Sequence, residues 1–164
     1  MALNIPAGKA IETRLELSKS DFPQRAKKLM DQGFTGYIAL TIDGYAGIEE
    51  GMLFFRKGSL VASTYHYDKF DMTIFGDFAA KQVLNASKAE FGVVDISELS
   101  MPQMELIVAF NEKISLTREI SPKDLNKLLP AVYVSDYSQQ VLSDVLKSSE
   151  SKYGLFKKLG LQEI

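Results

Sequence analysis

The residue in this sequence best suited to acid–base chemistry is His66, the only histidine among 164 residues. Histidine changes charge near neutral pH and is therefore the most frequent general acid or base. A nucleophilic triad would have to use this one imidazole, and the chain has no cysteine that could serve as a nucleophile. A lone histidine between Tyr65 and Tyr67 is more typical of a half-packed or surface position than of a catalytic one. We therefore predict no catalytic residues and a protein that is not an enzyme.

Carboxylates gather in two places. Asp68, Asp71 and Asp77 offer oxygen ligands of the kind that Ca²⁺ or Mg²⁺ prefers, but their spacing differs from that of an EF-hand. We expect a solvated acidic loop without a metal ion, with Asp77 in the first turn of a helix, where the helix dipole favours negative charge. Glu49 and Glu50 are adjacent, so a strand would direct them to opposite faces, and we interpret both as charged turn residues.

Two pairs of glycines, Gly33 with Gly36 and Gly44 with Gly47, suggest a phosphate-binding loop. Neither pair is followed by the Lys-Ser/Thr of a P-loop, and neither lies between a strand and a helix. We interpret them as turn glycines and predict no cofactor.

The composition argues against nucleic acid and membranes as partners. The net charge is −2 and no basic stripe stands out, whereas nucleic-acid binding draws most of its affinity from neutralised phosphates. The absence of cysteine excludes disulfides and thiolate metal sites and is compatible with an intracellular protein. The amino-terminal residues lack the apolar core of a signal peptide, and no run approaches the ~20 apolar residues of a membrane span. We expect a soluble protein of the cytoplasm.

These chemistry-bearing residues lie on or beside a predicted three-stranded antiparallel meander at residues 33–66. Apolar and less apolar residues alternate over 37–42, as in a strand with one buried face. Residues 52–55 are apolar on both faces, which indicates a central strand. Lys57-Gly58 then offers the positive φ that a tight hairpin needs, and the returning strand leads to His66.

Further elements surround the meander, and two of the helices begin at capping-box sequences, Asp21 with Gln24 and Ser100 with Gln103. The predicted helices span 21–32, 74–86 and 101–111, and the further predicted strands span 11–17, at an edge of the sheet, and 91–96. We expect an α+β domain at residues 1–120, in which the antiparallel sheet is covered on one face by the three helices. A helical extension is expected at 121–164.

The order of these segments resembles a known group of domains. A helix leads into GFTGYIAL, then EEGMLFFRKGSLVAS and GDFAAKQVL follow, and a strand begins at AEFGVVD. This pattern resembles the PATAN-like domains of unknown function, which occur in prokaryotic signalling proteins, often beside response-regulator receivers. It is most similar to a related archaeal family of uncharacterised proteins with an L-x-I-P-x-G lead, here Leu3 to Gly8. The resemblance covers about residues 3–115 and implies protein–protein contacts in signalling or regulation, with no catalytic residues to carry over.

One predicted helix is more apolar than a single sheet face requires. Over residues 100–111 apolar side chains occur nearly all the way round, which is typical of a helix buried on several sides or shared with a partner. We expect three side chains to pack on the sheet and two to face a partner in a homodimer: the first group is Leu106, Ile107 and Phe110, and the second is Met104 and Val108.

The carboxy-terminal segment 151–164 carries a second candidate interaction surface, formed by Leu155, Phe156 and Leu159. A helix this short is marginal alone and gains order only by docking. Its few lysines are offset by glutamates, so we expect no stable membrane anchoring. We predict instead that it docks in a protein groove, of its own chain or of a second copy.

The sequence thus predicts a non-enzymatic protein–protein interaction or regulatory module in a prokaryotic, archaeal signalling context. The alternative is a small-ligand-binding domain with an apolar pocket lined by Tyr65, Tyr67, Phe70 and Phe75. A closed pocket with convergent polar groups would favour ligand binding, and a flat apolar patch would favour a protein partner.

Overall fold

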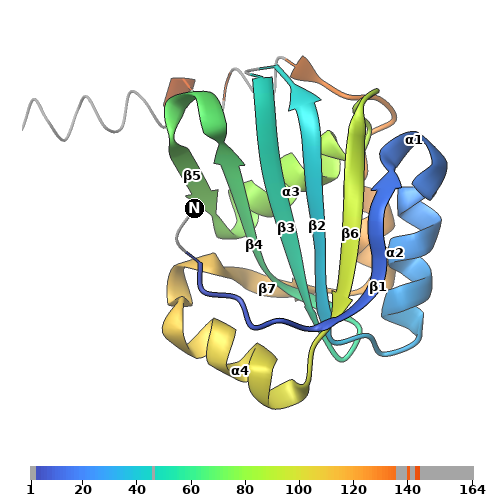
Figure 1. Ribbon diagram of the computed structural model, residues 1–164, viewed down its shortest axis with the longest axis vertical. Coiled ribbons are helices and arrows are strands. Elements are labelled where there is room, and N and C mark those ends of the chain that lie inside the picture. The colour runs from blue at the N-terminus through green and yellow to red at the C-terminus, as the bar shows by residue number, and fades with distance from the viewer. Residues whose placement is uncertain (1–2, 46, 136–139, 141–142, 145–164) are drawn as a thin grey trace, which may run out of the picture. The chain divides into compact units, whose positions relative to one another are not determined.

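The computed structural model describes residues 3–45, 47–135, 140 and 143–144. The chain divides into two compact units, Met1–Tyr133 and Val134–Ile164, and the architecture given below is that of the first unit (Figure 1). It is an α+β fold built on a seven-stranded antiparallel sheet, as predicted.

Strands and helices alternate along much of the chain. The strands are β1 (Lys9–Glu16), β2 (Gly36–Gly44), β3 (Gly47–Arg56), β4 (Ser59–Tyr67), β5 (Met72–Phe75), β6 (Gly92–Glu98) and β7 (Ser115–Ile120). The α-helices of the described residues are α1 (Leu17–Ser20), α2 (Phe22–Asp31), α3 (Gly76–Ala86), α4 (Met101–Phe110) and α5 (Pro122–Leu128). Two short 3-10 helices, η1 (Asp68–Phe70) and η2 (Glu112–Ile114), complete the list.

The predicted meander is confirmed as β2, β3 and β4. Lys57 and Gly58 form its second turn, with φ angles of 49° and 83°, as a hairpin with a right-handed twist requires. The strand order is β1-β6-β2-β3-β4-β5. The strand predicted at 91–96 is β6, which lies between β1 and β2, and β1 is an edge strand as expected.

Two strands, β5 and β7, were not predicted from the sequence. Both pair with the outer edge of β4. β5 pairs with Thr64–Tyr67, and β7 pairs with the opposite end of β4 from Leu60 to Ala62. β5 has only four residues and runs directly into α3, so it offers too short a pattern for alternation to be recognised. Three of the six residues of β7 are exposed, so its sequence lacks the apolar residues that would mark a strand with one buried face.

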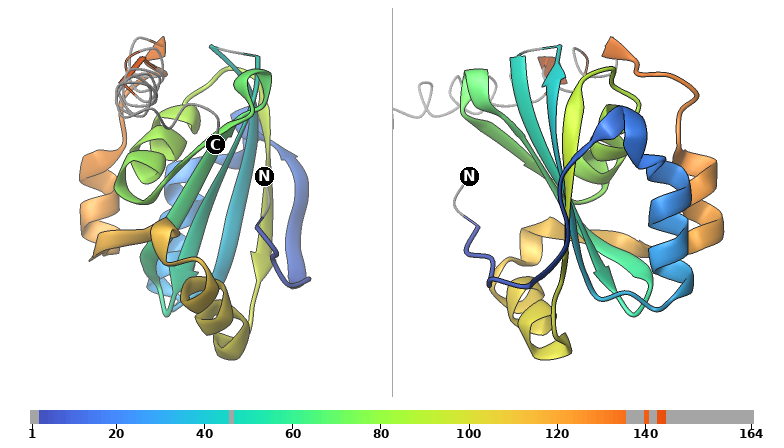
Figure 2. Two further views of the ribbon diagram at one scale, coloured as in Figure 1. Left: turned by 90° about the vertical axis from the view of Figure 1, so that its left-hand side faces the viewer. Right: turned by 45° about the vertical axis from the view of Figure 1, so that its right-hand side comes forward.

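Helices cover both faces of the sheet, so the expectation that all three lie on one face is wrong for α4. We call the face of the sheet that α3 covers the back face. A Cβ added to Gly51 of β3 would lie there, 2.7 Å from Cγ2 of Val83 in α3. The helix α2 lies on the same side of the sheet (Figure 2). On the front face, Met52 belongs to a cluster that includes Met104 and Ile107 of α4. A central strand that is apolar on both faces needs cover on both, and β3 receives it from α3 behind and α4 in front.

Of the two predicted capping boxes, the one at Ser100 is confirmed and the one at Asp21 is not. The Ser100 hydroxyl accepts a hydrogen bond from the Gln103 N–H (3.2 Å), and the Gln103 side chain accepts one from the Ser100 N–H (2.9 Å), as in a capping box. Asp21 makes no side-chain cap, because the short helix α1 precedes it. It forms the joint between α1 and α2 in the left-handed conformation, with φ of 44°.

The first compact unit extends further than residue 120. The helix α5 contacts α2, and Leu125 of α5 is fully buried. The first compact unit runs to Tyr133 and includes α5.

Candidate functional site

The lone histidine lies in a polar cluster on the front face of the sheet, at the end of β4. The His66 side chain is buried, with 5% of its surface exposed. Its Nδ1 is joined to Thr73 Oγ1 by a hydrogen bond of 2.8 Å, and Nε2 lies 3.4 Å from Asp68 Oδ1 and 3.8 Å from Asp71 Oδ1. The two aspartates belong to the turn between β4 and β5, so the imidazole ties that turn to the sheet.

Glu50 of β3 completes the cluster because it is the cross-strand partner of His66. Burial raises the pKa of the Glu50 carboxyl, the negative charge of Asp68 raises it further, and so does a hydrogen bond between the two carboxyl groups. A hydrogen bond between two carboxyl groups requires a proton on one of them. The arrangement places the Glu50 and Asp68 carboxyl groups next to each other beside the imidazole.

Thr73, His66 and Asp68 stand in the order hydroxyl, imidazole, carboxylate that nucleophilic triads use. Thr73 and His66 are also direct cross-strand neighbours in β5 and β4, so the sheet register alone accounts for the hydrogen bond between them. The imidazole is also nearly closed to solvent, which leaves little room for a substrate. The register and the burial of the imidazole together account for this arrangement as part of the β4–β5 pairing.

Glu49 and Glu50 point to opposite faces of β3, as expected, but neither is a turn residue. Both lie within β3, and Glu49 is fully buried on the back face. The hydroxyl of Tyr65 donates a hydrogen bond of 2.7 Å to Glu49 Oε1. Burial and the negative charge of Glu49 together raise the pKa of Tyr65 well above its usual value. The pair is a structural hydrogen bond of the core.

The three aspartates of the acidic segment do not act together. Asp68 and Asp71 face His66, whereas Asp77 lies at the start of α3 and accepts hydrogen bonds from the Thr117 N–H (3.0 Å) and hydroxyl (2.6 Å). Asp77 thus anchors β7 to α3. Within the ranges that the structure describes, no group of three or more histidine, aspartate or glutamate side chains is placed to hold a metal ion.

The four aromatic residues of the alternative, ligand-binding reading do not line one pocket. Tyr65 and Tyr67 are fully buried on the back face, where their rings pack edge to face with centroids 5.1 Å apart. Phe75 packs against the front-face cluster, and Phe70 is exposed. Strand alternation separates Phe75 from the two tyrosines, so this prediction of an aromatic pocket is wrong.

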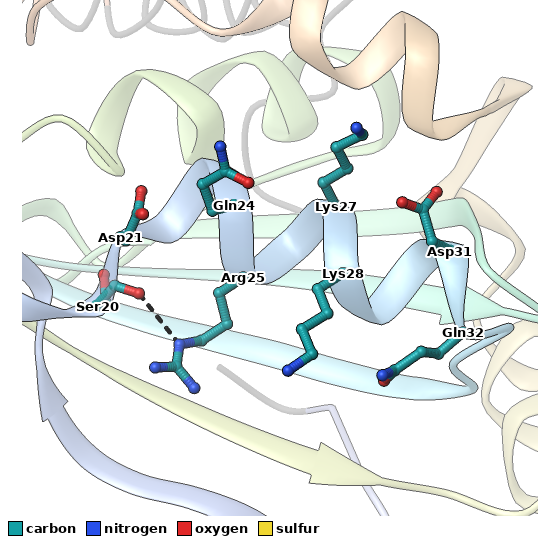
Figure 3. Close-up of a pocket in the computed structure, with 8 residues that line it drawn as sticks. All are labelled: Ser20, Asp21, Gln24, Arg25, Lys27, Lys28, Asp31 and Gln32. Carbon is teal, nitrogen blue, oxygen red and sulfur yellow. Dashed lines mark hydrogen bonds between the residues drawn. The ribbon is translucent and has the colours of Figure 1, made fainter.

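A hollow along α2 collects polar side chains of both charges (Figure 3). Arg25 and Lys28 point to one side of the helix, and Gln24, Lys27 and Asp31 point to the other. Arg25 is occupied by Glu12, at 3.0 Å, and by the carbonyl oxygen of Ser20, at 3.1 Å. This surface is a solvated helix face.

The helix α4 is rotated relative to the prediction. Met104 and Ile107 are buried, and Val108 packs against the same cluster, so Met104 and Val108 face the core. Leu106 and Phe110 point outward instead, with 53% and 81% of their surfaces exposed. Because apolar residues occur nearly all the way round the helix, the sequence does not determine which side of it faces the core.

The outward side of α4 borders an apolar groove. The amino-terminal segment runs beside α4, and together they line a hollow of the surface formed by Asn4, Ile5, Pro6, Leu106, Ile107, Phe110 and Asn111. We call the apolar part of this region, Ile5, Pro6, Leu106 and Phe110, the α4 surface. Leu106 and Phe110 are exposed, and Ile5 and Pro6 are half-buried. The other interaction candidates, Leu155, Phe156 and Leu159, lie outside the described residues.

Comparison with protein families identifies the group to which the fold belongs. Residues 3–111 match the family described as "Uncharacterized protein conserved in archaea (DUF2226)". The chain belongs to this archaeal family. No curated protein and no solved structure matches it. The expected resemblance to an uncharacterised archaeal family is confirmed, whereas the link to PATAN-like domains stays a prediction.

The region shared with the archaeal family contains both features built above. It begins in the segment beside α4 and ends at Asn111, directly after that helix, so the α4 surface lies wholly within it. The His66 cluster also lies within it, whereas β7 and α5 follow it. Among the described residues no helix is both long and apolar enough to cross a membrane.

Proposed function

We propose that this chain is a non-enzymatic protein–protein interaction module with a regulatory role in archaeal signalling, and that the α4 surface binds its partner. The observation that carries the proposal is the outward position of Leu106 and Phe110. These two large apolar side chains lie one helical turn apart, and both are more than half exposed.

The α4 surface is continuous, which distinguishes it from the scattered exposed apolar residues of most proteins. Ile5 and Pro6 line the same hollow as Leu106 and Phe110. Contiguous exposed apolar patches mark interaction sites, because covering them with a partner removes apolar surface from water.

A second copy of this chain is the partner that this surface fits. Two-fold dimers use the same patch on both subunits, so a protruding group has to lie beside the hollow that receives it. Phe110 is 81% exposed and lines the same hollow as Ile5, Pro6 and Leu106. Large aromatic side chains are also the usual anchors of such interfaces.

The signalling context rests on the resemblance to PATAN-like domains, and the archaeal context rests on membership of the archaeal family. The polar cluster at His66 adds no substrate pocket that would favour an enzyme instead.

The test is the substitution Phe110→Glu, followed by sedimentation velocity over a range of concentrations. A charge placed in an apolar interface loses its hydration without gaining a partner. We expect the wild type to self-associate and the variant to lose about 2 kcal/mol or more of association energy, roughly 30-fold in Kd. The fold itself should not change, because Phe110 is largely exposed.

Phe78→Glu is the matched control, because Phe78 is an exposed phenylalanine on the helix α3, at 68% exposure. It should self-associate like the wild type. A wild type that stays monomeric at roughly 1 mM, or an equal loss in both variants, would overturn the proposal.

A further inference from the structure

We propose that a groove between α3, β7 and α5 binds an acidic segment of a partner protein, which inserts a large apolar side chain between two cations. We call it the α3–α5 groove, and the described residues that line it are Asp77, Ala80, Lys81, Thr117, Arg118, Ile120 and Leu128. It shares no residue with the α4 surface, so this inference does not depend on the proposed self-association.

The floor of the groove is apolar. Ala80 of α3 is buried, Ile120 at the end of β7 is half-buried, and Leu128 of α5 is 41% exposed. Covering Ile120 and Leu128 with an apolar side chain removes their remaining surface from water. At about 270 Å³ the groove is smaller than the pockets of roughly 300–1,000 Å³ that enclose small ligands. A side chain that projects from a larger partner suits it better than a free small molecule.

Two cations line the groove beside this floor. Lys81 of α3 and Arg118 of β7 are both exposed. Within the part of the chain that the structure describes, neither of them forms an ion pair. Each can therefore receive a carboxylate of the partner without giving up an existing one.

Asp77 is the carboxylate of the groove, and its two oxygen atoms are already bound. Oδ1 accepts the Thr117 N–H at 3.0 Å, and Oδ2 accepts the Thr117 hydroxyl at 2.6 Å. Asp77 and Lys81 are four residues apart on α3, which is the spacing of a helical ion pair. Because Thr117 occupies both oxygens instead, the positive charge of Lys81 stays available to a ligand.

The remaining carboxylates of β7 and α5 are also engaged. Strand alternation directs Glu119 to the opposite side of β7 from Arg118, and Glu119 pairs with Arg56 at 2.9 Å. Asp124 of α5 lies 3.7 Å from Lys127. The groove thus presents positive charge above an apolar floor, which complements carboxylates placed beside an apolar side chain.

The number of cations favours a protein segment over a lipid surface. Anionic membranes are bound by clusters of roughly four to eight basic residues, whereas the groove offers two. Two cations match a short acidic segment instead, in which one carboxylate precedes and one follows the apolar side chain.

The experiment is a titration of the full chain with the acetylated peptide Glu-Asp-Leu-Phe-Glu-Asp, followed by proton–nitrogen correlation spectra. We expect saturable shifts at the amides of Ala80, Lys81, Arg118 and Leu128, with a Kd below about 1 mM. Two further peptides separate the two parts of the proposal. Glu-Asp-Ser-Gly-Glu-Asp keeps the charge without the apolar side chains, and Lys-Ser-Leu-Phe-Lys-Ser keeps those side chains without the carboxylates. Both should bind at least about tenfold more weakly.

The chain offers a matched pair of charge reversals. Lys81→Glu combined with Arg118→Glu turns attraction into repulsion and should weaken binding roughly tenfold or more. Lys27→Glu combined with Lys28→Glu changes the net charge equally on exposed positions of α2 and should bind like the wild type. Leu128→Ala tests the floor separately and should weaken binding about threefold.

The proposal is overturned if the wild type shows no saturable shifts at a peptide concentration of roughly 5 mM. It is equally overturned if all three peptides bind alike, or if the two double variants bind alike. Shifts of the groove amides on dilution of the protein alone would assign the groove to a second copy of the chain and would also contradict the proposal.

Discussion

At the scale of single residues, two neighbouring glutamates have opposite environments because a strand directs successive side chains to opposite faces. Glu50 lies beside Asp68 and His66 on the front face, and Glu49 is enclosed on the back face with the Tyr65 hydroxyl. The Glu49 carboxylate also packs closely against Gly44, since a Cβ added there would meet its oxygen atoms. The two carboxyls therefore belong to separate parts of the molecule, one in the core and one in the polar cluster around His66.

The Glu49–Tyr65 bond leads to a prediction about stability. Tyr65→Phe removes the donor and leaves the ring in place, so it isolates the hydrogen bond to a buried carboxylate. Such bonds contribute about 1.5–3 kcal/mol. We expect the free energy of unfolding in urea to fall by that amount.

Tyr45→Phe is the control for this change, since the Tyr45 side chain is half exposed. It should alter the unfolding free energy by less than about 0.5 kcal/mol. An equal effect of the two substitutions would mean that the Tyr65 hydroxyl adds no stability.

The pairing of Glu50 with His66 was not predictable from the sequence, and a register shift in β3 explains why. Counting outward from the Lys57-Gly58 turn pairs Arg56 with Ser59 and would place Glu49 opposite His66. A register shift between Phe54 and Phe55 moves the pairing by one residue and brings Glu50 there instead. Such a bulge leaves no mark in the apolar pattern, so its effect on the facing side chains appears only in the structure.

At the scale of elements, the hairpin β3–β4 is fitted closely against the end of α2. The N–H of Gly58 donates a hydrogen bond of 2.9 Å to the carbonyl oxygen of Phe34. A Cβ at Gly58 would lie 2.3 Å from the carbonyl oxygen of Met30, which is a backbone atom and cannot yield easily. The glycine is therefore needed both for its positive φ and for the close approach of the helix.

Gly58→Ala should accordingly cost more than a glycine replacement that affects φ alone. Gly47 is the matched position, with φ of +87° and no atom within 4 Å of an added Cβ. We expect Gly47→Ala to destabilise the fold by about 1 kcal/mol and Gly58→Ala by roughly 3 kcal/mol. Thermal unfolding of both variants measures the difference, and equal losses would contradict close packing at Gly58.

The elements that the sequence predicts well are those whose pattern is local. Alternation identifies β2, the double apolar face identifies β3 as central, and the capping box at Ser100 locates the start of α4. The rotation of α4 depends instead on distant contacts. Arg56 at the end of β3 pairs with Glu105 of α4 at 3.5 Å and with Glu119 of β7 at 2.9 Å. These three residues lie far apart in the sequence, so no local pattern predicts their contacts.

At the scale of the whole molecule, the first compact unit presents its two candidate features on separate parts of the front face. The lower part is covered by α4 and the amino-terminal segment, whose outer side is the α4 surface (Figure 1). The other part carries the polar cluster around His66 at the β4–β5 turn. The two features can therefore be altered separately by mutation, since no residue is shared between them.

The separation also decides how an effect on either feature is recognised. Phe110→Glu should weaken self-association by roughly 30-fold and leave the amide signals of the cluster around His66 unchanged. Glu50→Gln should change those signals and leave self-association unchanged. A variant that alters both properties would show that the two regions communicate through β3 or β4.

The measurement that tests the central claim most directly is a dilution series of proton–nitrogen correlation spectra, from roughly 1 mM to 20 µM. The account predicts concentration-dependent shifts at Ile5, Leu106, Phe110 and Asn111, with the α2 and α3 signals unchanged. Phe110→Glu should remove these shifts. Spectra that do not change with concentration, or shifts centred on another surface, would contradict the assignment of the α4 surface as the site of interaction.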